Sequence, residues 1–158
     1  MLDRDAIRDT LARYFTGHDR GDPAWVDTAF TATARLYIDG IQVRGPGAVP
    51  PGERAEPRGV PMNQLLATTH VMGQCEIRLD GDRARAETYA VAYLALSGEK
   101  DRPRMLVRGL RYLDHLVRQG ERWLIEERRH QLDWMFETDA TLALPRGQRA
   151  QIFGADDR

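Results

Sequence analysis

The sequence predicts an α+β domain in which a curved antiparallel sheet wraps around N-terminal helices as a cone-shaped α+β barrel. Apolar residues recur with helical spacing near the N-terminus, whereas long segments beyond residue 69 alternate apolar and polar residues between short turns. Helices that precede the strands, instead of alternating with them, favour packing on one face of an antiparallel sheet. A twisted sheet covered in this way is expected to enclose an apolar pocket. With 158 residues, the chain is long enough for one domain with its own core.

Two helices are expected at the N-terminal end. The first covers residues 3–16, with Asp3 as its N-cap and Gly17 as its C-cap. The second begins after Asp22, which suits an N-cap because Pro23 follows it. The apolar residues of the first helix fall at i, i+4, i+7 and i+8 and form one stripe: Ile7, Leu11, Tyr14 and Phe15.

A short hairpin follows, with strands over residues 34–38 and 41–43 joined by the turn Asp39-Gly40. The next segment, 44–61, holds five prolines and four glycines and is expected to be a long loop. Such a loop is either a lid that closes over a binding site or a disordered surface insertion.

The remaining elements are a short helix and a meander of long strands. The helix is expected over residues 61–68. The strands are expected over residues 70–79, 83–96, 105–118 and 122–134. Beyond them the pattern weakens, so the domain should span residues 1–136 and residues 137–158 should form a C-terminal tail.

Composition and charge exclude several classes of protein. The net charge is −1 and charges of both signs are interspersed, which argues against a surface for nucleic acid or membrane. No apolar run approaches the about 20 residues of a membrane span, and no signal peptide is recognisable. The single Cys75 excludes an internal disulfide and suits a small core position. We therefore expect a cytoplasmic protein that binds a small-molecule substrate and neither nucleic acid nor membrane.

Sequence motifs for cofactors are absent. The chain has no phosphate loop, no dinucleotide fingerprint and no nucleophile elbow. His18, Asp19 and His70 could in principle supply two histidines and a carboxylate to a metal, but adjacent residues at a helix end rarely converge on one ion. We expect neither a metal nor another cofactor.

Asp19 and His70 are the main candidates for acid–base chemistry. Asp19 lies in the turn-like segment 17–22, and His70 lies where the long hairpin begins. An imidazole held by a buried carboxylate transfers protons near neutral pH. Taken alone, Asp19 could be a plain turn residue and His70 a core histidine. His18 is expected to point away from the pair, as a surface residue or as a second acid.

An ordered set of residues spans positions 4–136. It comprises Ile7, Leu11, Tyr14, Asp19-Arg20-Gly21-Asp22, Phe30, Thr69-His70, Asp80-Gly81-Asp82-Arg83-Ala84, Glu87-Thr88-Tyr89, the segments 109–114 and 118–125, Arg128 and Asp133-Trp134. This set resembles the SnoaL-like family of the nuclear transport factor 2-like superfamily, whose members are cone-shaped α+β barrels. Within it, the chain is most similar to the branch that includes scytalone dehydratase and hexachlorocyclohexane dehydrochlorinase.

The resemblance implies a catalytic pair. Lyases of that branch use an aspartate at the end of the first helix and a histidine at the start of the central hairpin, so Asp19 would orient and charge His70, and His70 would be the base. Two features of the branch differ here. The dehydrochlorinase has a lysine where this chain has Tyr14, and the second histidine of the dehydratase has no clear match.

Alternation along the strand that begins at His70 suggests further substrate-binding residues. With a period of two, Met72 and Gln74 share the face of His70, whereas Val71 and Cys75 lie on the other face. Met72 and Gln74 are therefore candidates for the binding site.

Four more residues are candidates for substrate binding. Tyr14 is either core packing or a phenol that bonds substrate. Tyr112 and Asp114 share one strand face, and Asp114 could reach the site or form a surface ion pair. Arg128 and Arg129 point to opposite faces, so only one can lie inside. A buried arginine there would need a carboxylate partner or an anionic substrate.

Taken together, these residues predict a cofactor-independent lyase that carries out a dehydratase-type elimination on a small, apolar, cyclic substrate with a carbonyl group. An isomerase or cyclase could use the same pair, and the fold also serves non-catalytic small-molecule binding. We also expect a homo-oligomer, dimer or trimer, built on the outer sheet face with strands from 83–96 and 105–134, because one layer of helices leaves that face uncovered.

Overall fold

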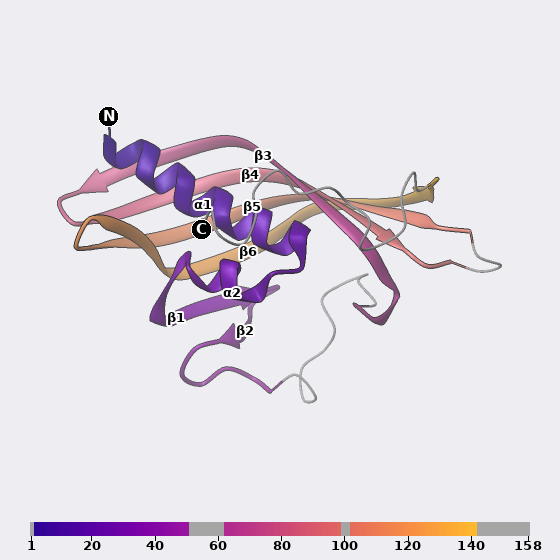
Figure 1. The fold of residues 1–158 in the computed structure, drawn as a ribbon, viewed down its shortest axis with the longest axis horizontal. Helices are drawn as coiled ribbons and strands as arrows, with labels where there is room; N and C mark the ends of the chain where they lie inside the picture. Colours follow the sequence, from indigo (N-terminus) through magenta and orange to yellow (C-terminus); the bar gives the residue numbers. More distant parts are fainter. Residues whose placement is uncertain (1, 51–61, 99–101, 142–158) are drawn as a thin grey trace.

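The computed structural model describes residues 2–50, 62–98 and 102–141 as two helices, a 3-10 turn and a six-stranded sheet (Figure 1). The elements are α1 (Leu2–Arg20), α2 (Pro23–Asp27), β1 (Phe30–Ile38), β2 (Ile41–Arg44), η1 (Met62–Gln64), β3 (Leu65–Asp80), β4 (Arg83–Leu96), β5 (Arg104–Gln119) and β6 (Arg122–Asp139). The strand order is β2-β1-β6-β5-β4-β3. The α+β fold is confirmed. The sheet is curved but open, and β1 runs parallel to β6 while the other neighbours are antiparallel.

One face of the sheet, here called the inner face, is covered by α1, which lies across the long strands (Figure 1). The expected stripe of α1 is buried there with the core. The strand β4 offers it a row of small side chains, so that the helix can approach closely: Ala84, Ala86, Thr88, Ala90 and Ala92. The helix is also tied to the sheet by Thr10, whose hydroxyl donates to the Trp123 carbonyl over 2.7 Å.

The first helix ends later than expected. It continues through Gly17, which is buried against Val26. No larger residue fits there, because a Cβ would lie 2.6 Å from the Val26 side chain. The helix ends at Gly21, which has a φ of +67° that favours glycine. The amides of Gly21 and Asp22 donate to the carbonyls of His18 and Gly17, the bonding of a Schellman cap. Asp19 therefore lies in the last helical turn and not beyond the helix.

The second helix begins as expected, since the Asp22 carboxylate accepts a hydrogen bond from the Trp25 amide over 3.0 Å. The prediction of a helix over residues 61–68 is wrong. Only Met62–Gln64 form a 3-10 turn, and β3 begins at Leu65 because this segment pairs with the end of β4. Strand pairing overrides a local helical pattern here.

The strand β4 matches the predicted bounds 83–96, whereas β6 runs to Asp139, past Trp134 and past the expected domain end at 136. Its extension pairs with the first residues of β5. Most of the expected loop 44–61 and of the expected tail 137–158 lies outside the described residues. No helix in the described ranges has the length and apolar character that crossing a membrane requires.

Candidate active site

Asp19 and His70 meet at the inner face, where the last turn of α1 lies against β3. The Nδ1 atom of His70 and Oδ1 of Asp19 are 2.7 Å apart, and the backbone amide of His70 donates to the second carboxylate oxygen over 2.9 Å. The Thr68 hydroxyl donates to Oδ1 over 3.0 Å. One carboxylate thus holds both the ring and the backbone of His70, which fixes the orientation of the imidazole.

The charge state of Asp19 follows from these contacts. Desolvation raises the pKa of its carboxyl group, but hydrogen bonds from the His70 ring and amide and from Thr68 outweigh it, so the pKa lies below its ordinary value. An ionised Asp19 accepts a hydrogen bond, which assigns the proton of neutral His70 to Nδ1. The Nε2 atom then carries the lone pair and is available as a base.

Aromatic rings surround the imidazole. The centroid of the Phe15 ring lies 5.6 Å from that of His70, and the His18 ring lies 6.1 Å away. The expectation that His18 points away from the pair is therefore wrong, but the residue is exposed, as expected of a surface residue. Its ring also packs edge-on against Tyr14 at 4.5 Å. Desolvation, with the cationic forms of His70 and Arg128, lowers the pKa of His18 to about 4, so His18 is neutral at pH 7.

Arg128 and Asp114 form a buried ion pair beside these rings. The Nε and Nη2 atoms of Arg128 each donate to one carboxylate oxygen of Asp114 over 2.7 Å, and both side chains are 0% exposed. The guanidinium also lies 4.1 Å from the centre of the Tyr14 ring. Asp114 is thus part of a buried pair and not of a surface pair.

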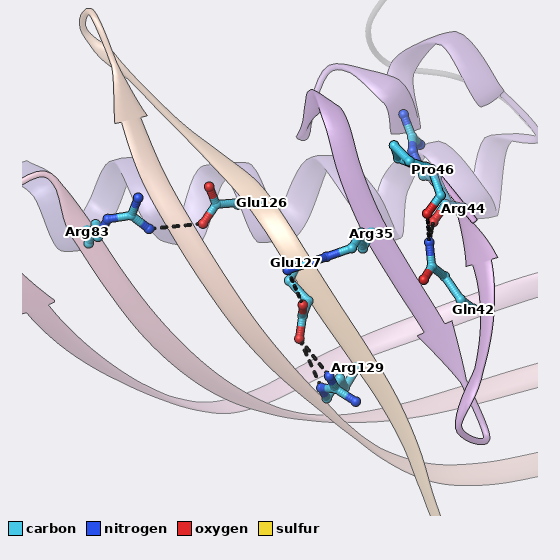
Figure 2. Close-up of polar contacts among 8 residues, drawn as sticks. All are labelled: Arg35, Gln42, Arg44, Pro46, Arg83, Glu126, Glu127 and Arg129. Carbon is cyan, nitrogen blue, oxygen red and sulfur yellow. Dashed lines mark hydrogen bonds and ion pairs between the residues drawn. The ribbon is translucent and has the colours of Figure 1, made fainter. Parts of the chain in front are cut away.

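Arg129 points to the other face, as the alternation predicts. It donates to Glu127 over 3.0 Å, and Glu127 also pairs with Arg35 of β1 over 2.8 Å. Figure 2 shows Glu127 between these two arginines. These contacts join β1 to β6 and take no part in the site.

Two tyrosines complete the inner wall. Tyr14 and Tyr112 are buried, and their ring centroids lie 5.7 Å apart. Desolvation raises the pKa of both phenols, although Arg128 acts in the opposite direction. Both therefore stay protonated at neutral pH and can donate a hydrogen bond.

Two residues of the site were missed by the sequence reasoning, Arg108 and His130. Arg108 is only 5% exposed, and His130 pairs with Tyr112 across β5 and β6. Desolvation lowers the pKa of His130 most, and the positive charges of Arg108, Arg128 and two histidines lower it further, to about 3. The alternation of the strands could have found both residues. In β5 it places Arg108 on the same face as Tyr112, and in β6 it places His130 on the same face as Arg128.

The face assignment for β3 is wrong beyond Met72. Met72 pairs with Ala90 and packs against the core, but the register then shifts, so that Cys75 is the next residue to pair on this face. Gln74 is exposed to solvent. The extra residue is a β-bulge, which reverses the alternation that follows it.

Among the neighbours of His70 is Phe15, a residue of the hydrophobic core. In the described part of the chain, no group of three or more His, Cys, Asp or Glu is placed to hold a metal ion. A surface hollow of about 270 Å³ lies elsewhere, between side chains that include Glu76, Arg85 and His115. It does not include Asp19 or His70, so the enclosed cavity expected beside them stays a prediction.

Fold and site together define an α+β protein of the nuclear transport factor 2-like class with a carboxylate–imidazole pair on the inner face of its sheet. The model of the SnoaL-like domain matches residues 1–129. The chain therefore belongs to the SnoaL-like family.

Solved structures share this fold at low identity. A hexachlorocyclohexane dehydrochlorinase of type 2 has a TM-score of 0.70 and 16% identity, with 92% of this chain and 95% of that chain covered. A scytalone dehydratase-like protein from Novosphingobium aromaticivorans has a TM-score of 0.67 and 16% identity, with 95% and 96% covered. A type 3 dehydrochlorinase from Novosphingobium barchaimii has a TM-score of 0.70 and 14% identity, with 91% and 95% covered. No curated protein sequence matches significantly. At these identities the likeness concerns the fold alone.

Proposed function

We propose that this protein is a cofactor-independent lyase that eliminates water from a small, cyclic, largely apolar substrate with a carbonyl group. His70 is the general base and Asp19 its partner. The observation that carries the proposal is the 2.7 Å contact between Nδ1 of His70 and Asp19, together with the hydrogen bond of the His70 amide to the same carboxylate. These contacts leave Nε2 as the basic atom.

The chemistry follows from this arrangement. Nε2 of His70 takes a proton from the carbon next to the carbonyl, and the electrons of that bond move toward the carbonyl oxygen. Asp19 stabilises the imidazolium that forms. The double bond then closes as hydroxide leaves the neighbouring carbon, and the imidazolium returns its proton to give water. A protonated Tyr14 or Tyr112 would stabilise the negative oxygen of the intermediate.

Two other outcomes use the same residues. An isomerase or cyclase would take the same proton and return it to another carbon, so product analysis separates it from a lyase. A non-catalytic binding domain would bind cyclic ketones and exchange no proton. The structural neighbours include a dehydrochlorinase and a dehydratase-like protein, and this supports the elimination.

The test uses cyclic β-hydroxy ketones, beginning with 3-hydroxycyclohexanone. Loss of water is followed by the absorbance of the conjugated enone, and proton removal by NMR of deuterium exchange next to the carbonyl. His70→Ala should abolish both, and Asp19→Asn should lower the rate on the order of 10²–10⁴-fold. Substrate affinity should change less, and a chelator should have no effect.

His115→Ala is the matched control, because His115 is an exposed histidine of the same sheet. Its rate should equal that of the wild type. A near-normal rate in His70→Ala would show that the base is another residue, with Tyr14 or Asp114 next to be tested. Binding of the ketones with neither elimination nor exchange would favour the binding domain instead.

A further inference from the structure

Arg108 stands opposite His70 on the inner face. The strand register pairs His70 of β3 with Ala92 of β4, and Ala92 with Arg108 of β5. Since neighbouring strands lie about 4.8 Å apart, the Cα atoms of His70 and Arg108 are about 10 Å apart. Only the methyl group of Ala92 stands between them in this row. The imidazole and the guanidinium therefore come from two positions of one row, separated by about the length of one small cyclic molecule.

The guanidinium of Arg108 is buried without a counter-ion. Its Nε and Nη2 atoms are inaccessible to solvent and donate to no acceptor among residues 2–50, 62–98 and 102–141. Desolvation lowers the pKa of Arg108, and Asp39, on the β1–β2 turn, opposes this only through space. Burial of an unpaired charge is costly, so the native site is expected to supply an anion.

Arg128 shows what Arg108 lacks. Arg128 uses its Nε and Nη2 atoms, one edge of the guanidinium, to hold both oxygens of Asp114. Arg108 leaves the same two atoms without partners. This edge matches the two oxygens of a carboxylate. The neighbouring His130 is neutral at pH 7 and Arg128 is paired with Asp114, so Arg108 offers a single positive charge that suits a monoanion.

We propose that Arg108 is a specificity-determining residue that binds a carboxylate of the substrate through Nε and Nη2 while the reacting carbon lies at His70. The substrate class is then a small cyclic acid that also carries the carbonyl group, rather than an uncharged ketone. The inference rests on the proposed function, because it takes His70 as the place of reaction.

The experiment compares two ligands of the same shape, benzoate and benzamide, by calorimetric titration of the full chain. The wild type should bind benzoate about tenfold more tightly or better, as expected for a charge-assisted pair of hydrogen bonds. The methyl NMR signal of Ala92 should shift on titration with benzoate. In Arg108→Gln the preference should fall to near one. Arg111→Gln is the matched control, because Arg111 lies on the other face of the same strand, and it should keep the preference.

Folding is checked separately. Arg108→Gln should unfold at a denaturant concentration equal to or above that of the wild type, because it removes a buried unpaired charge. Clear destabilisation would show that Arg108 is a structural ion-pair residue and would overturn the proposal. Equal affinity for both ligands in the wild type, a preference that survives Arg108→Gln, or an unmoved Ala92 signal would do the same.

Further variants separate this inference from the proposed function. His70→Ala should retain the preference for benzoate, since Arg108 is intact. Turnover of neutral ketones and of the corresponding keto acids with equal efficiency would refute the role of Arg108 and leave the lyase intact. Preference for benzoate with no turnover of any keto acid would refute the lyase and leave the anion site intact.

Discussion

The strands β5 and β6 carry two arginine–carboxylate pairs with nearly the same geometry, one on each face. On the inner face Arg128 holds Asp114 through two bonds of 2.7 Å, and both side chains are 0% exposed. On the outer face Arg111 holds Asp133 through bonds of 2.8 and 2.9 Å, and the side chains are 28% and 27% exposed. Bond lengths do not distinguish these pairs, whereas burial does.

The difference shows how the surroundings decide the role of an ion pair. Water and salt can replace the partner of an exposed charge, so its loss changes stability little. A buried charge has no such replacement, so removing one partner leaves the other unsolvated. Arg108 is the third case, a buried arginine without the carboxylate.

The largest expected effect comes from breaking the inner pair. Asp114→Ala leaves Arg128 charged and buried, which should lower the free energy of unfolding by about 3–5 kcal/mol. Urea denaturation followed by circular dichroism measures it. The double variant Asp114→Leu/Arg128→Leu should recover part of the loss, because no isolated charge remains. A loss below about 1 kcal/mol in the single variant would mean that water reaches Arg128.

The outer face offers the next test, because several large apolar residues are exposed there. They are Val71, Tyr89, Tyr93, Trp134 and Phe136. We predict that the chain forms a dimer or trimer through this face. Trp134→Ser should shift it toward monomer, with a loss of about 2 kcal/mol or more, as for a central interface tryptophan.

Sedimentation velocity over a range of concentrations measures this shift. Leu2→Ser is the control, since Leu2 is an exposed apolar residue of α1 and not of the outer sheet face. It should leave the mass unchanged. A wild-type chain that is monomeric at micromolar concentration would refute the prediction.

A smaller effect concerns pH. The folded-state pKa of His130, about 3, lies below the unfolded value of 6.5. Between these values the unfolded chain binds a proton that the folded chain does not, so stability is present above pH 6.5 and falls as the pH is lowered. One such group contributes a slope of at most about 1.4 kcal/mol per pH unit.

His130→Gln should therefore flatten the dependence of the unfolding free energy on pH between 6.5 and 4.5. Denaturant titrations at several pH values measure the slopes of the wild type and of the variant. An unchanged slope in the variant would contradict a neutral His130 at the inner face.

The smallest effect should come from the outer pair. Asp133→Ala removes the partner of Arg111, but water and Glu87, 3.4 Å away, remain. The denaturation midpoint should be close to that of the wild type. A loss as large as that of Asp114→Ala would show that burial is not what separates the two faces, or that Asp133 is covered in an oligomer.

Local patterns predicted much of the fold. The alternation in β4 gave its bounds, and Asp22 before Pro23 gave the start of α2. Errors arose where tertiary contacts decide. Gly17 packs on Val26, and α1 continues through it instead of ending there. Residues 65–69 form a strand because they pair with β4. Neither contact is visible in a window of sequence.

The contact between Asp19 and His70 was predicted, and the residues around it were predicted less well. The contact of Asp19 with His70 depended on a resemblance, because their separation along the chain gives no hint of it. Alternation could have placed Arg108 inside, but an arginine is normally exposed, and only the structure shows that it is buried without a carboxylate. The bulge after Met72 could not be read from the sequence, since it depends on the pairing with β4.

The spacing of Phe15 and Asp19 on α1 has a consequence for how this chain can change. The two residues are four apart, so they share one face of the helix, and both contact His70. One residue inserted between them would turn Asp19 by about 100° around the helix axis and carry it away from the imidazole. An insertion at this place would thus separate the imidazole from its carboxylate without removing any side chain of the candidate site.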